Sequence, residues 1–498
     1  MTASRSTKIL LALFGAHLLL KVLLFGEVAH VARYGDEAYY LDSAKALSNL
    51  VRDLVGAGPV HLEELRRNVV GNGWFMPGNS ILLTPLYLVD PDASITVVRI
   101  YLGVVTSLLL LVTALRVRSV LGDLYAGLLI VGTGLVPMWV LYSFAAWGDL
   151  VAGLLIVLMV LELVTVIRTL RHGDSPTWRD AVRLGLVAIA VVYARSSASL
   201  LVAGMAVVLV IVATTLLRGR VRLRAFGAVG LAGVLFAALL APWSLFASST
   251  LGGRVVTTTS VPVVLANTFG DRTELCFGPC DPTSTIWFSP TNYSREVARA
   301  TGTNELVVQK QMSSYARRDV TASSYARDVG MDFARYTLQP AAFTRYLLGG
   351  SEGRPTPANL FVTVLTDLLW GLLVLGIVGT LLRVVRRPVE LQVLGLLITL
   401  GLGSLLTQPF VHIAGSRYWT SAAPLAALGL ALLVQLADLR RSTPRFAAGS
   451  AIMAVESAPA DTSAVPAEVI SRWLTIVQTG LAAAVVLTVV ALVTLALT

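Results

Sequence analysis

The chain has 498 residues, of which 55% are hydrophobic and only 14% are charged, and its mean hydropathy is +0.75. Soluble domains carry about 25% charged residues, and disordered chains contain far less Leu, Val and Ala, so the composition excludes both classes. The net charge of +10 comes mostly from arginines, which form short clusters between apolar runs. Such clusters are typical of cytoplasmic loops that meet anionic lipid headgroups, and not of a nucleic-acid-binding surface. We therefore predict an all-α, polytopic membrane protein.

Eleven apolar stretches approach the roughly 20 residues that a helix needs to cross a bilayer, so we expect about eleven transmembrane helices. They lie at 8–29, 96–115, 123–142, 148–167, 181–194, 197–217, 225–247, 360–382, 390–409, 418–437 and 472–497. The first stretch resembles a signal peptide, but it lacks a small-residue cleavage site and continues past Lys21. We interpret it as a retained helix.

Every second connection between these stretches is basic. By the positive-inside rule, these connections and the N-terminus, which carries Arg5 and Lys8, are expected in the cytoplasm. The basic clusters are Arg116 and Arg118; Arg168, Arg171, Arg179 and Arg183; Arg218, Arg220, Arg222 and Arg224; Arg383, Arg386 and Arg387; and Arg440, Arg441 and Arg445. Two long segments, 30–95 and 248–358, then lie outside the cytoplasm, and we expect any chemistry to reside there.

The same pattern divides the chain into parts. We predict a transmembrane module whose first outer loop is catalytic, an extracytoplasmic loop domain, further transmembrane helices, a flexible cytoplasmic linker and a last span. These parts are 1–247 with the loop 30–95, 248–358, 359–438, 439–470 and 471–498. The linker is rich in Ala, Ser and Pro, as is typical of mobile segments that lack a packed core.

The loop domain is expected to contribute helices. Residues 293–347 are predicted to form amphipathic helices that lie over the site and are interrupted at Pro340. Tyr315, Tyr325 and Tyr336 lie on these helices. They either stack on sugar rings or anchor the helices at the membrane interface, and we favour the second role because it is ordinary for tyrosines in this setting.

The two cysteines of the chain, Cys276 and Cys280, lie in the sequence LCFGPCDP of the loop domain. The intervening Gly278 and Pro279 allow a tight turn, and the compartment is oxidising, so we expect a local disulfide. Two free thiols are the alternative. A zinc site is disfavoured because only two ligands are evident.

An acidic pair, Asp36 and Glu37, opens a helix that we expect over residues 33–48, lying on the membrane surface. Such a pair is equally typical of charges that cap a helix start. Alternating steps of four and three residues place four residues along one side of this helix: Asp36, Tyr40, Ser43 and Leu47.

Further polar residues are expected at the same membrane surface. Asp149 lies at the start of the fourth span, Arg195 lies between the fifth and sixth, and Arg417 with Tyr418 lies at the start of the tenth. One ionisable residue at the end of a span is more often structural, because its side chain reaches the interface at little cost. Several such residues at the same membrane surface favour a functional site there. Arginine offers a phosphate a bidentate fork and a carboxylate accepts a proton from a hydroxyl, so the pattern suits a lipid-linked phosphate substrate.

At these residues the chain resembles the GT-C superfamily of membrane glycosyltransferases, in the branch of the protein O-mannosyltransferases and the lipid A aminoarabinose transferase. The resemblance is carried by the order and sidedness of short motifs spread along most of the chain. They are GDEAYYLDSAKAL after the first span, the Asp after the third, YARSSASLL before the sixth, APWSLFASSTLGGRVVTTTSVPVVLANTFGD after the seventh and SRYWTSAAPLAALGLALL near the tenth.

The resemblance implies a GT-C fold and an inverting transfer of one sugar from a polyprenyl phosphate to a hydroxyl of a glycan, lipid or protein, outside the cytoplasmic membrane. Asp36 would be the general base that deprotonates this hydroxyl. Glu37 and Asp149 are the next candidates, as supporting partners, cation ligands or acceptor contacts. Three side chains are expected to bind the donor phosphate: Arg417, Arg195 and Tyr418. The composition is typical of GC-rich bacteria, in which mannose or arabinose is the expected sugar.

Acceptor binding is assigned to Tyr40, Trp74 and His61. Trp74 lies in the turn-rich segment GNGWFMPGNS, residues 71–80, which is expected to line the path of the donor or the acceptor. His61 and His412 also face outside and, together with the acidic residues, would suit a divalent metal. Two unrelated histidines are a weak signal, so metal dependence stays open, and no other cofactor is expected.

Two other functions remain open from the sequence. A flippase or transporter for a lipid-linked sugar is expected to show an internal repeat and charged residues near the bilayer midplane. No repeat relates the two halves, and the buried acidic candidates Glu162 and Asp367 do not face one another in an obvious way. A glycan polymerase that uses a diphosphate-linked donor shares the many spans and the outer arginines. The early acidic pair and the late Arg-Tyr motif favour the monophosphate-dependent enzyme.

Overall fold

The computed structural model describes residues 5–33, 35–171, 174–216, 219–271, 289–338, 364, 389–411, 418–441, 472, 474–480 and 483. Within these ranges all regular elements are helical. Six helical segments are long and apolar enough to cross a membrane. They belong to α1 (Arg5–Val28), α5 (Ile95–Leu121), α8 (Asp149–Arg171), α11 (Gly219–Leu251), α19 (Val389–Leu406) with the turn η5 (Gln408–Phe410), and α20 (Trp419–Arg441). The chain is thus a helical membrane protein, and these six match predicted spans.

Of the other five predicted spans, two correspond to shorter helices, one is broken, and two lie mostly outside the described residues. The stretches at 181–194 and 197–217 correspond to the shorter helices α9 (Trp178–Ala194) and α10 (Ser199–Leu216), which are joined by the turn η3 (Ser196–Ala198). The stretch at 123–142 is not one helix. It is divided into α6 (Asp123–Leu129), the π-helical turn η2 (Ile130–Gly134) and α7 (Pro137–Tyr142). Almost all of 360–382 and most of 472–497 lie outside the described residues.

The break at 123–142 is caused by a proline, and a side chain of the distant helix α1 binds a carbonyl oxygen in the broken segment. Pro137 has no N–H and stands at the first position of α7, so the preceding turn cannot continue as a regular helix. The carbonyl oxygen of Gly134 accepts a hydrogen bond from His17 Nδ1 at 2.7 Å. On the same helix, Lys21 Nζ donates to Gly103 O at 2.5 Å and to Thr106 Oγ1 at 2.7 Å. The polar side chains of α1 therefore form hydrogen bonds with the interrupted segment and with its neighbour α5. Such bonds are needed because irregular backbone at membrane depth must find hydrogen-bond partners inside the protein.

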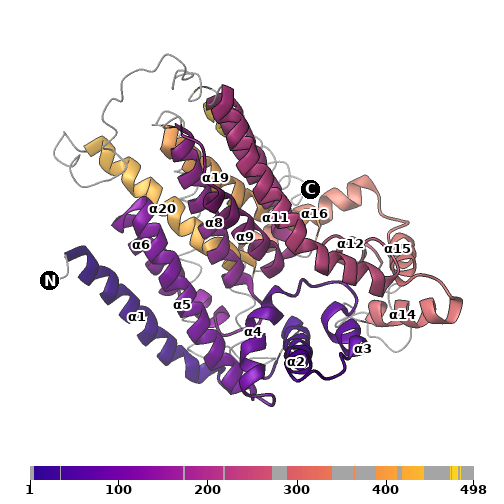
Figure 1. Ribbon diagram of the computed structural model, residues 1–498. Helices are drawn as coiled ribbons and strands as arrows, with labels where there is room; N and C mark the ends of the chain where they lie inside the picture. The colour runs from indigo at the N-terminus through magenta and orange to yellow at the C-terminus, as the bar shows by residue number, and fades with distance from the viewer. Residues whose placement is uncertain are drawn as a thin grey trace.

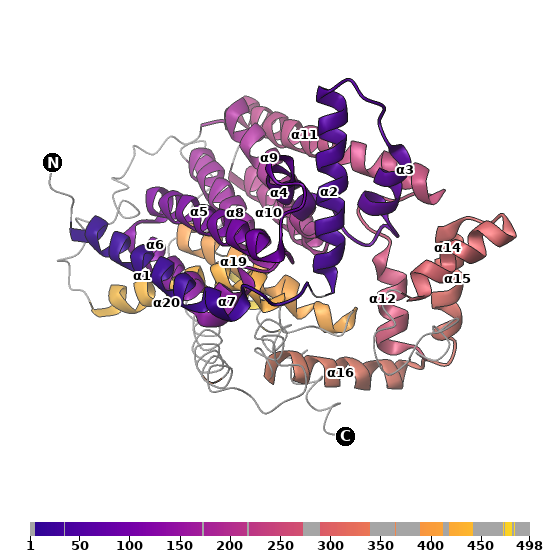
Figure 2. The same cartoon turned by 90° about the horizontal axis from the view of Figure 1, so that it is seen from below.

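Short helices gather at one end of the bundle. α2 (Asp36–Val55) lies across the ends of the long helices, together with α3 (Leu62–Leu65), η1 (Arg66–Val70) and α4 (Gly78–Val89) (Figures 1 and 2). Beside them lie α12 (Ser260–Phe269), α14 (Ser289–Thr301) and α15 (Glu305–Ala316), followed by α16 (Ala322–Leu338). We call this end, defined by α2, α3 and α4, the loop end. The predicted helices of 293–347 are confirmed as far as Leu338, and Pro340 lies outside the described residues.

The opposite end carries the arginines at the far ends of α5 and α8, Arg116, Arg118 and Arg168, and we call it the arginine end. Of the six long apolar segments, the one in α8 is the most buried. Its neighbours α5, α9, α19 and α20 surround it, whereas α1 and α11 turn apolar side chains such as Val22 and Leu223 outward. A residue at the first turn of α8 therefore lies on the axis of the bundle, at the loop end.

Candidate active site

The site begins at α2, the first helix of the loop end. Its first residue is the half-buried Asp36, as predicted, and the preceding Gly35 has a φ of +57°, a left-handed value that favours glycine. Tyr40 and Ser43, which share a face with Asp36, are buried. A carboxylate in the first turn is favoured by the helix dipole. The predicted helix is confirmed, and Tyr40 and Ser43, on the same side of it as Asp36, face the protein interior.

Glu37, the second member of the acidic pair, is buried and paired with Arg99 of α5. Arg99 Nη1 donates to Glu37 Oε1 at 2.9 Å, and Arg99 Nη2 donates to Oε2 at 3.1 Å, so the contact is a two-pronged fork. The side chains are 0% and 1% exposed. Glu37 Oε1 also accepts the backbone N–H of Ala146 at 2.9 Å. Glu37 is thus an internal anchor of the loop that leads into α8.

Asp149, Arg195 and Tyr418 come together at the same end, although they are far apart in sequence. Asp149 Oδ1 forms an ion pair with Arg195 Nη1, and both side chains are largely buried. The Arg195 guanidinium lies over the Tyr418 ring, 4.2 Å from its centroid, and Arg195 Nε donates to Ser197 Oγ at 2.9 Å. The predicted gathering of these three residues is confirmed. A carboxylate and an aromatic ring hold the guanidinium in one orientation.

Local backbone geometry places this pair. Asp149 begins α8, directly after Gly148, whose φ of +72° again favours glycine. Arg195 follows the last residue of α9 and has an extended backbone, with φ −155° and ψ 110°, so the chain turns away from the helix there. Asn79 of α4 lies between the two: its amide N–H₂ group is 3.4 Å from Trp147 O and 3.4 Å from Ala194 O.

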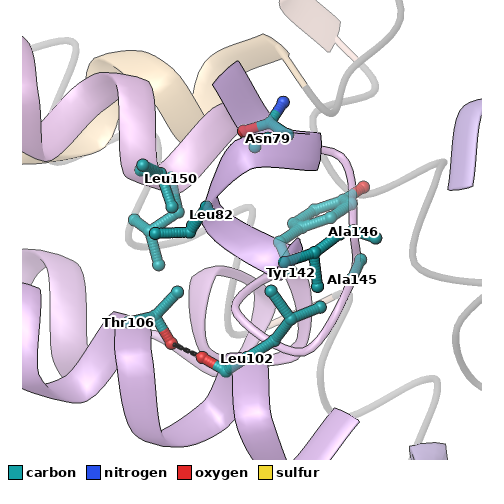
Figure 3. Close-up of a pocket in the computed structure, with 11 residues that line it drawn as sticks. Asn79, Leu82, Leu102, Thr106, Tyr142, Ala145, Ala146 and Leu150 are labelled. Atoms are coloured by element: carbon teal, nitrogen blue, oxygen red, sulfur yellow. Dashed lines mark hydrogen bonds between the residues drawn. The ribbon is translucent and has the colours of Figure 1, made fainter. Parts of the chain in front are cut away.

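Asn79 also bounds a small cavity of about 10 Å³ next to the start of α8 (Figure 3). Its walls come from α4, α5 and α8 and from the segment after α7, and Figure 3 shows Leu82, Leu102 and Leu150 among them. Asn79 Oδ1 is buried and has no hydrogen-bond partner among the described residues. A cavity of this size has room for about one water molecule and excludes a sugar.

A second cavity, of about 20 Å³, opens directly at Arg195. It is lined by Arg195 and Ser197, by Gln408 of η5, and by Ser421 and Leu425 of α20. Its lining thus combines polar and apolar side chains. A cavity of this size has room for one or two water molecules, so neither a phosphate nor a hydrocarbon chain fits inside it.

The remaining predicted site residues lie elsewhere. Tyr40 packs against Phe75, with ring centroids 5.3 Å apart, and Trp74 is buried, so neither ring offers an open platform. His61 is exposed and follows the far end of α2, a helix of 20 residues whose length of about 30 Å separates it from Asp36. Four residues lie outside the described part of the chain: Arg417, His412, Cys276 and Cys280. Among the residues that the structure describes, no group of three or more His, Cys, Asp or Glu is placed to hold a metal.

The turn-rich segment 71–80 is fastened by the helices of the loop domain. Arg295 of α14 donates to Gly71 O at 2.7 Å and to Asn72 Oδ1 at 2.9 Å. Thr259 reinforces the contact through its N–H to Gly73 O at 2.8 Å and its hydroxyl to Asn72 O at 2.7 Å. The loop domain therefore holds the segment that precedes Asn79, which is how it reaches the site.

The tyrosines of the loop domain have different environments. Tyr325 packs against Phe269 and donates its hydroxyl to Phe410 O at 2.7 Å, and burial raises the pKa of this phenol, so it stays neutral. Tyr315 is 55% exposed, with the Arg318 guanidinium 4.1 Å from its ring centroid. The Tyr336 side chain lies outside the described part of the structure. Tyr325 thus joins α16 to η5, and of the two tyrosines whose side chains are described, Tyr315 is the one with an accessible ring.

Arg99 and Asn79 are the two residues of this region that the sequence did not single out. Arg99 had a detectable signal, because it is a lone charge in the apolar sequence ITVVRIYLGVV, and a charge at such a position usually has a buried partner. Asn79 had none, because an asparagine in a turn-rich segment is ordinary. No family model matches this chain, and no curated protein or solved structure is detectably similar to it.

Proposed function

We propose that this protein is an inverting membrane glycosyltransferase of the GT-C type. It transfers one sugar from a polyprenyl phosphate donor to a hydroxyl of a glycan, lipid or protein acceptor. The reaction takes place at the loop end, on the extracytoplasmic face of the cytoplasmic membrane, and the chain crosses that membrane about eleven times. Mannose and arabinose are the first sugars to test.

The observation that carries the proposal is the Arg195 guanidinium, held by Asp149 and Tyr418 at the end of an apolar bundle. A guanidinium has five N–H donors in a planar fork, so it can bind a carboxylate and a phosphate at once. A phosphate joined to a long hydrocarbon chain needs this cation at headgroup level, next to lipid. A soluble sugar phosphate would need no such position.

The charge balance between the donor phosphate and the buried ion pairs supports a second cation at the donor site. The Asp149–Arg195 pair is neutral as it stands, and so is the Glu37–Arg99 pair. A phosphodiester that enters brings one negative charge, and the leaving polyprenyl phosphate gains another. We therefore propose that Arg417, which precedes Tyr418 in the chain, supplies the additional positive charge.

Asp36 is the better base of the acidic pair. Glu37 already uses both carboxylate oxygens for Arg99, and one of them also for Ala146, whereas Asp36 is half-buried at the start of α2. In the proposed reaction, Asp36 takes the proton of the acceptor hydroxyl. The hydroxyl oxygen forms a bond to the anomeric carbon from the face opposite the phosphate. The bond between that carbon and the phosphate oxygen breaks, polyprenyl phosphate leaves with the electron pair, and the configuration is inverted.

The test is release of free polyprenyl phosphate by purified protein in nanodiscs, supplied with a panel of polyprenyl phosphate sugars and a membrane extract as the source of acceptor. The wild type is expected to consume one donor, and Asp36→Asn to lower the rate about a hundredfold or more, as loss of a general base does. The matched control is Asp42→Asn on the same helix, where the carboxylate is 52% exposed and paired with Arg33. It should stay within twofold of the wild type.

Two results would contradict the proposal. Full activity of Asp36→Asn would exclude Asp36 as the base. A wild type that consumes no donor would exclude the monophosphate-dependent reaction, and the next measurement would be the flux of lipid-linked sugar across a sealed bilayer, followed by a test with diphosphate-linked donors.

A further inference from the structure

The Glu37–Arg99 pair does more than neutralise a buried charge. Besides its fork to Glu37, Arg99 donates from Nη1 to Phe144 O at 2.9 Å and from Nη2 to Val31 O at 3.2 Å. Glu37 in turn accepts from the Ala146 N–H. One ion pair thus joins three segments: the chain that enters α2, the outer end of α5, and the loop 143–148 that enters α8.

The two segments on either side of this pair carry the proposed chemistry. Val31 and Glu37 flank the start of α2, where Asp36 lies. Phe144 and Ala146 lie three to five residues before Asp149, which holds Arg195. The connection is short on both sides, since Asp36 is the chain neighbour of Glu37 and only Trp147 and Gly148 separate Ala146 from Asp149.

A buried ion pair is a poor choice for stability alone. Desolvation of two charges offsets most of their attraction, and apolar side chains of similar volume often stabilise a fold as well or better. The pair contributes a fixed orientation of the bonded groups. A fork with two further carbonyl bonds fixes the orientation of the guanidinium, and hence of the segments bonded to it, to a degree that apolar packing does not.

We infer that Glu37 and Arg99 are positioning residues that set the distance between the proposed base, Asp36, and the proposed phosphate-binding pair, Asp149 and Arg195. This inference rests on the proposed function. It requires that loss of the pair lower turnover while donor binding stays intact, because donor affinity depends on Arg195 and the base acts only in the chemical step.

The experiment uses the double variant Glu37→Met/Arg99→Met, which leaves no unpaired buried charge. Its matched control is Arg118→Met/Asp123→Asn, which removes the solvent-exposed pair at the arginine end. Three quantities are measured in nanodiscs: kcat, the donor KM, and the hydrogen–deuterium exchange of the peptide that contains residues 143–148. The exchange rate reports how firmly the Glu37–Arg99 pair holds the loop 143–148, and its measurement does not require enzyme activity.

The expected result is a kcat at least tenfold lower, a donor KM within twofold of the wild type, and exchange in 143–148 at least tenfold faster, with the control unchanged in all three. If the double variant does not fold, Arg99→Lys takes its place. It keeps the charge but loses the fork, so kcat should fall and exchange should rise in the same direction.

While the wild type is active, the inference is overturned by a variant kcat within twofold of the wild type, or by a lowered kcat with unchanged exchange in 143–148. A donor KM that rises as steeply as kcat falls also overturns it, because the pair would then support donor binding. An inactive wild type overturns the proposed function, and this inference falls with it.

Discussion

The two ends of the helical bundle both carry ion pairs, but the most buried of the described pairs lie at the loop end. At the loop end, the Glu37–Arg99 side chains are 0–1% exposed, and those of Asp149 and Arg195 are 5% and 14% exposed. At the arginine end, Arg118 and Asp123 are 31% and 47% exposed, and Arg116 is 31% exposed where it meets the largely buried Glu162, which is 10% exposed. The loop end has exposed pairs as well, Arg33–Asp42 and Arg66–Glu63, so the two sealed pairs are what distinguish it.

The difference indicates what each end does. Exposed pairs contribute little to stability and tolerate change, which suits arginines whose role is to meet lipid headgroups. Buried pairs have a large desolvation cost and are kept where orientation matters. The neighbours of the pairs agree with this view, since the buried pairs hold loop backbone and an aromatic ring, whereas Arg118 contacts only Asp123 and Thr7 among the contacts described.

The largest expected effect is an all-or-none contrast in labelling. In a variant with Cys276 and Cys280 replaced by serine, a cysteine at Val55, which is 85% exposed at the loop end, should react with an impermeant maleimide on intact cells. A cysteine at Ser119, exposed at the arginine end, should react only after permeabilisation. Labelling of the second position alone on intact cells would reverse the orientation and place the proposed site in the cytoplasm.

The next effect concerns folding stability. Arg99→Met leaves Glu37 buried without its partner and is expected to cost about 3–5 kcal/mol, whereas Arg118→Met removes an exposed pair and should cost less than about 1 kcal/mol. Thermal unfolding of the purified protein, followed by fluorescence of buried tryptophans such as Trp139 and Trp147, measures both. Equal losses for the two variants would show that burial does not distinguish the two ends.

Variants of Arg195 test whether the loop end binds the donor phosphate. Arg195→Ala should lower kcat/KM for the donor by about a hundredfold or more, because the cation acts on the phosphate in the bound state and in the transition state. Arg195→Lys keeps the charge but not the fork and should lose about tenfold. The matched control is Arg66→Ala, which removes an arginine 44% exposed at the same end, paired with Glu63. A full rate for Arg195→Lys would show that only the charge matters.

The sequence predicted much of this arrangement, for physical reasons. Helix α2 begins at Asp36 because a glycine precedes an acidic pair and an amphipathic run, and all of these signals are local. The gathering of Asp149, Arg195 and Tyr418 followed from counting spans, because residues at the same ends of alternating helices must meet at one surface. Local signals and topology were sufficient for both.

What the sequence left out depends on side-chain partners. The resemblance alone ranked Asp36 ahead of Glu37, and a physical reason appears only once Arg99 is seen to occupy both oxygens of Glu37. The break at 123–142 was missed because hydropathy does not register that Pro137 interrupts a helix whose freed carbonyl reaches His17. Burial of Tyr40 and Trp74 was also invisible, since aromatic residues in an outer loop suit a binding surface and a core equally well.

The smallest expected effect separates the ring of Tyr418 from its hydroxyl. The contact with Arg195 is between a guanidinium and an aromatic face, 4.2 Å from the ring centroid, so Tyr418→Phe should leave donor KM within twofold. Tyr418→Ala removes the face and should raise donor KM by about three- to tenfold, which corresponds to about 0.6–1.4 kcal/mol for a partly exposed cation–π contact. If phenylalanine were as harmful as alanine, the hydroxyl would be the group that acts, and Tyr418 would bind the donor directly and not through Arg195. The contrast between these two variants therefore decides whether the ring completes the buried arrangement of the loop end or belongs to the substrate.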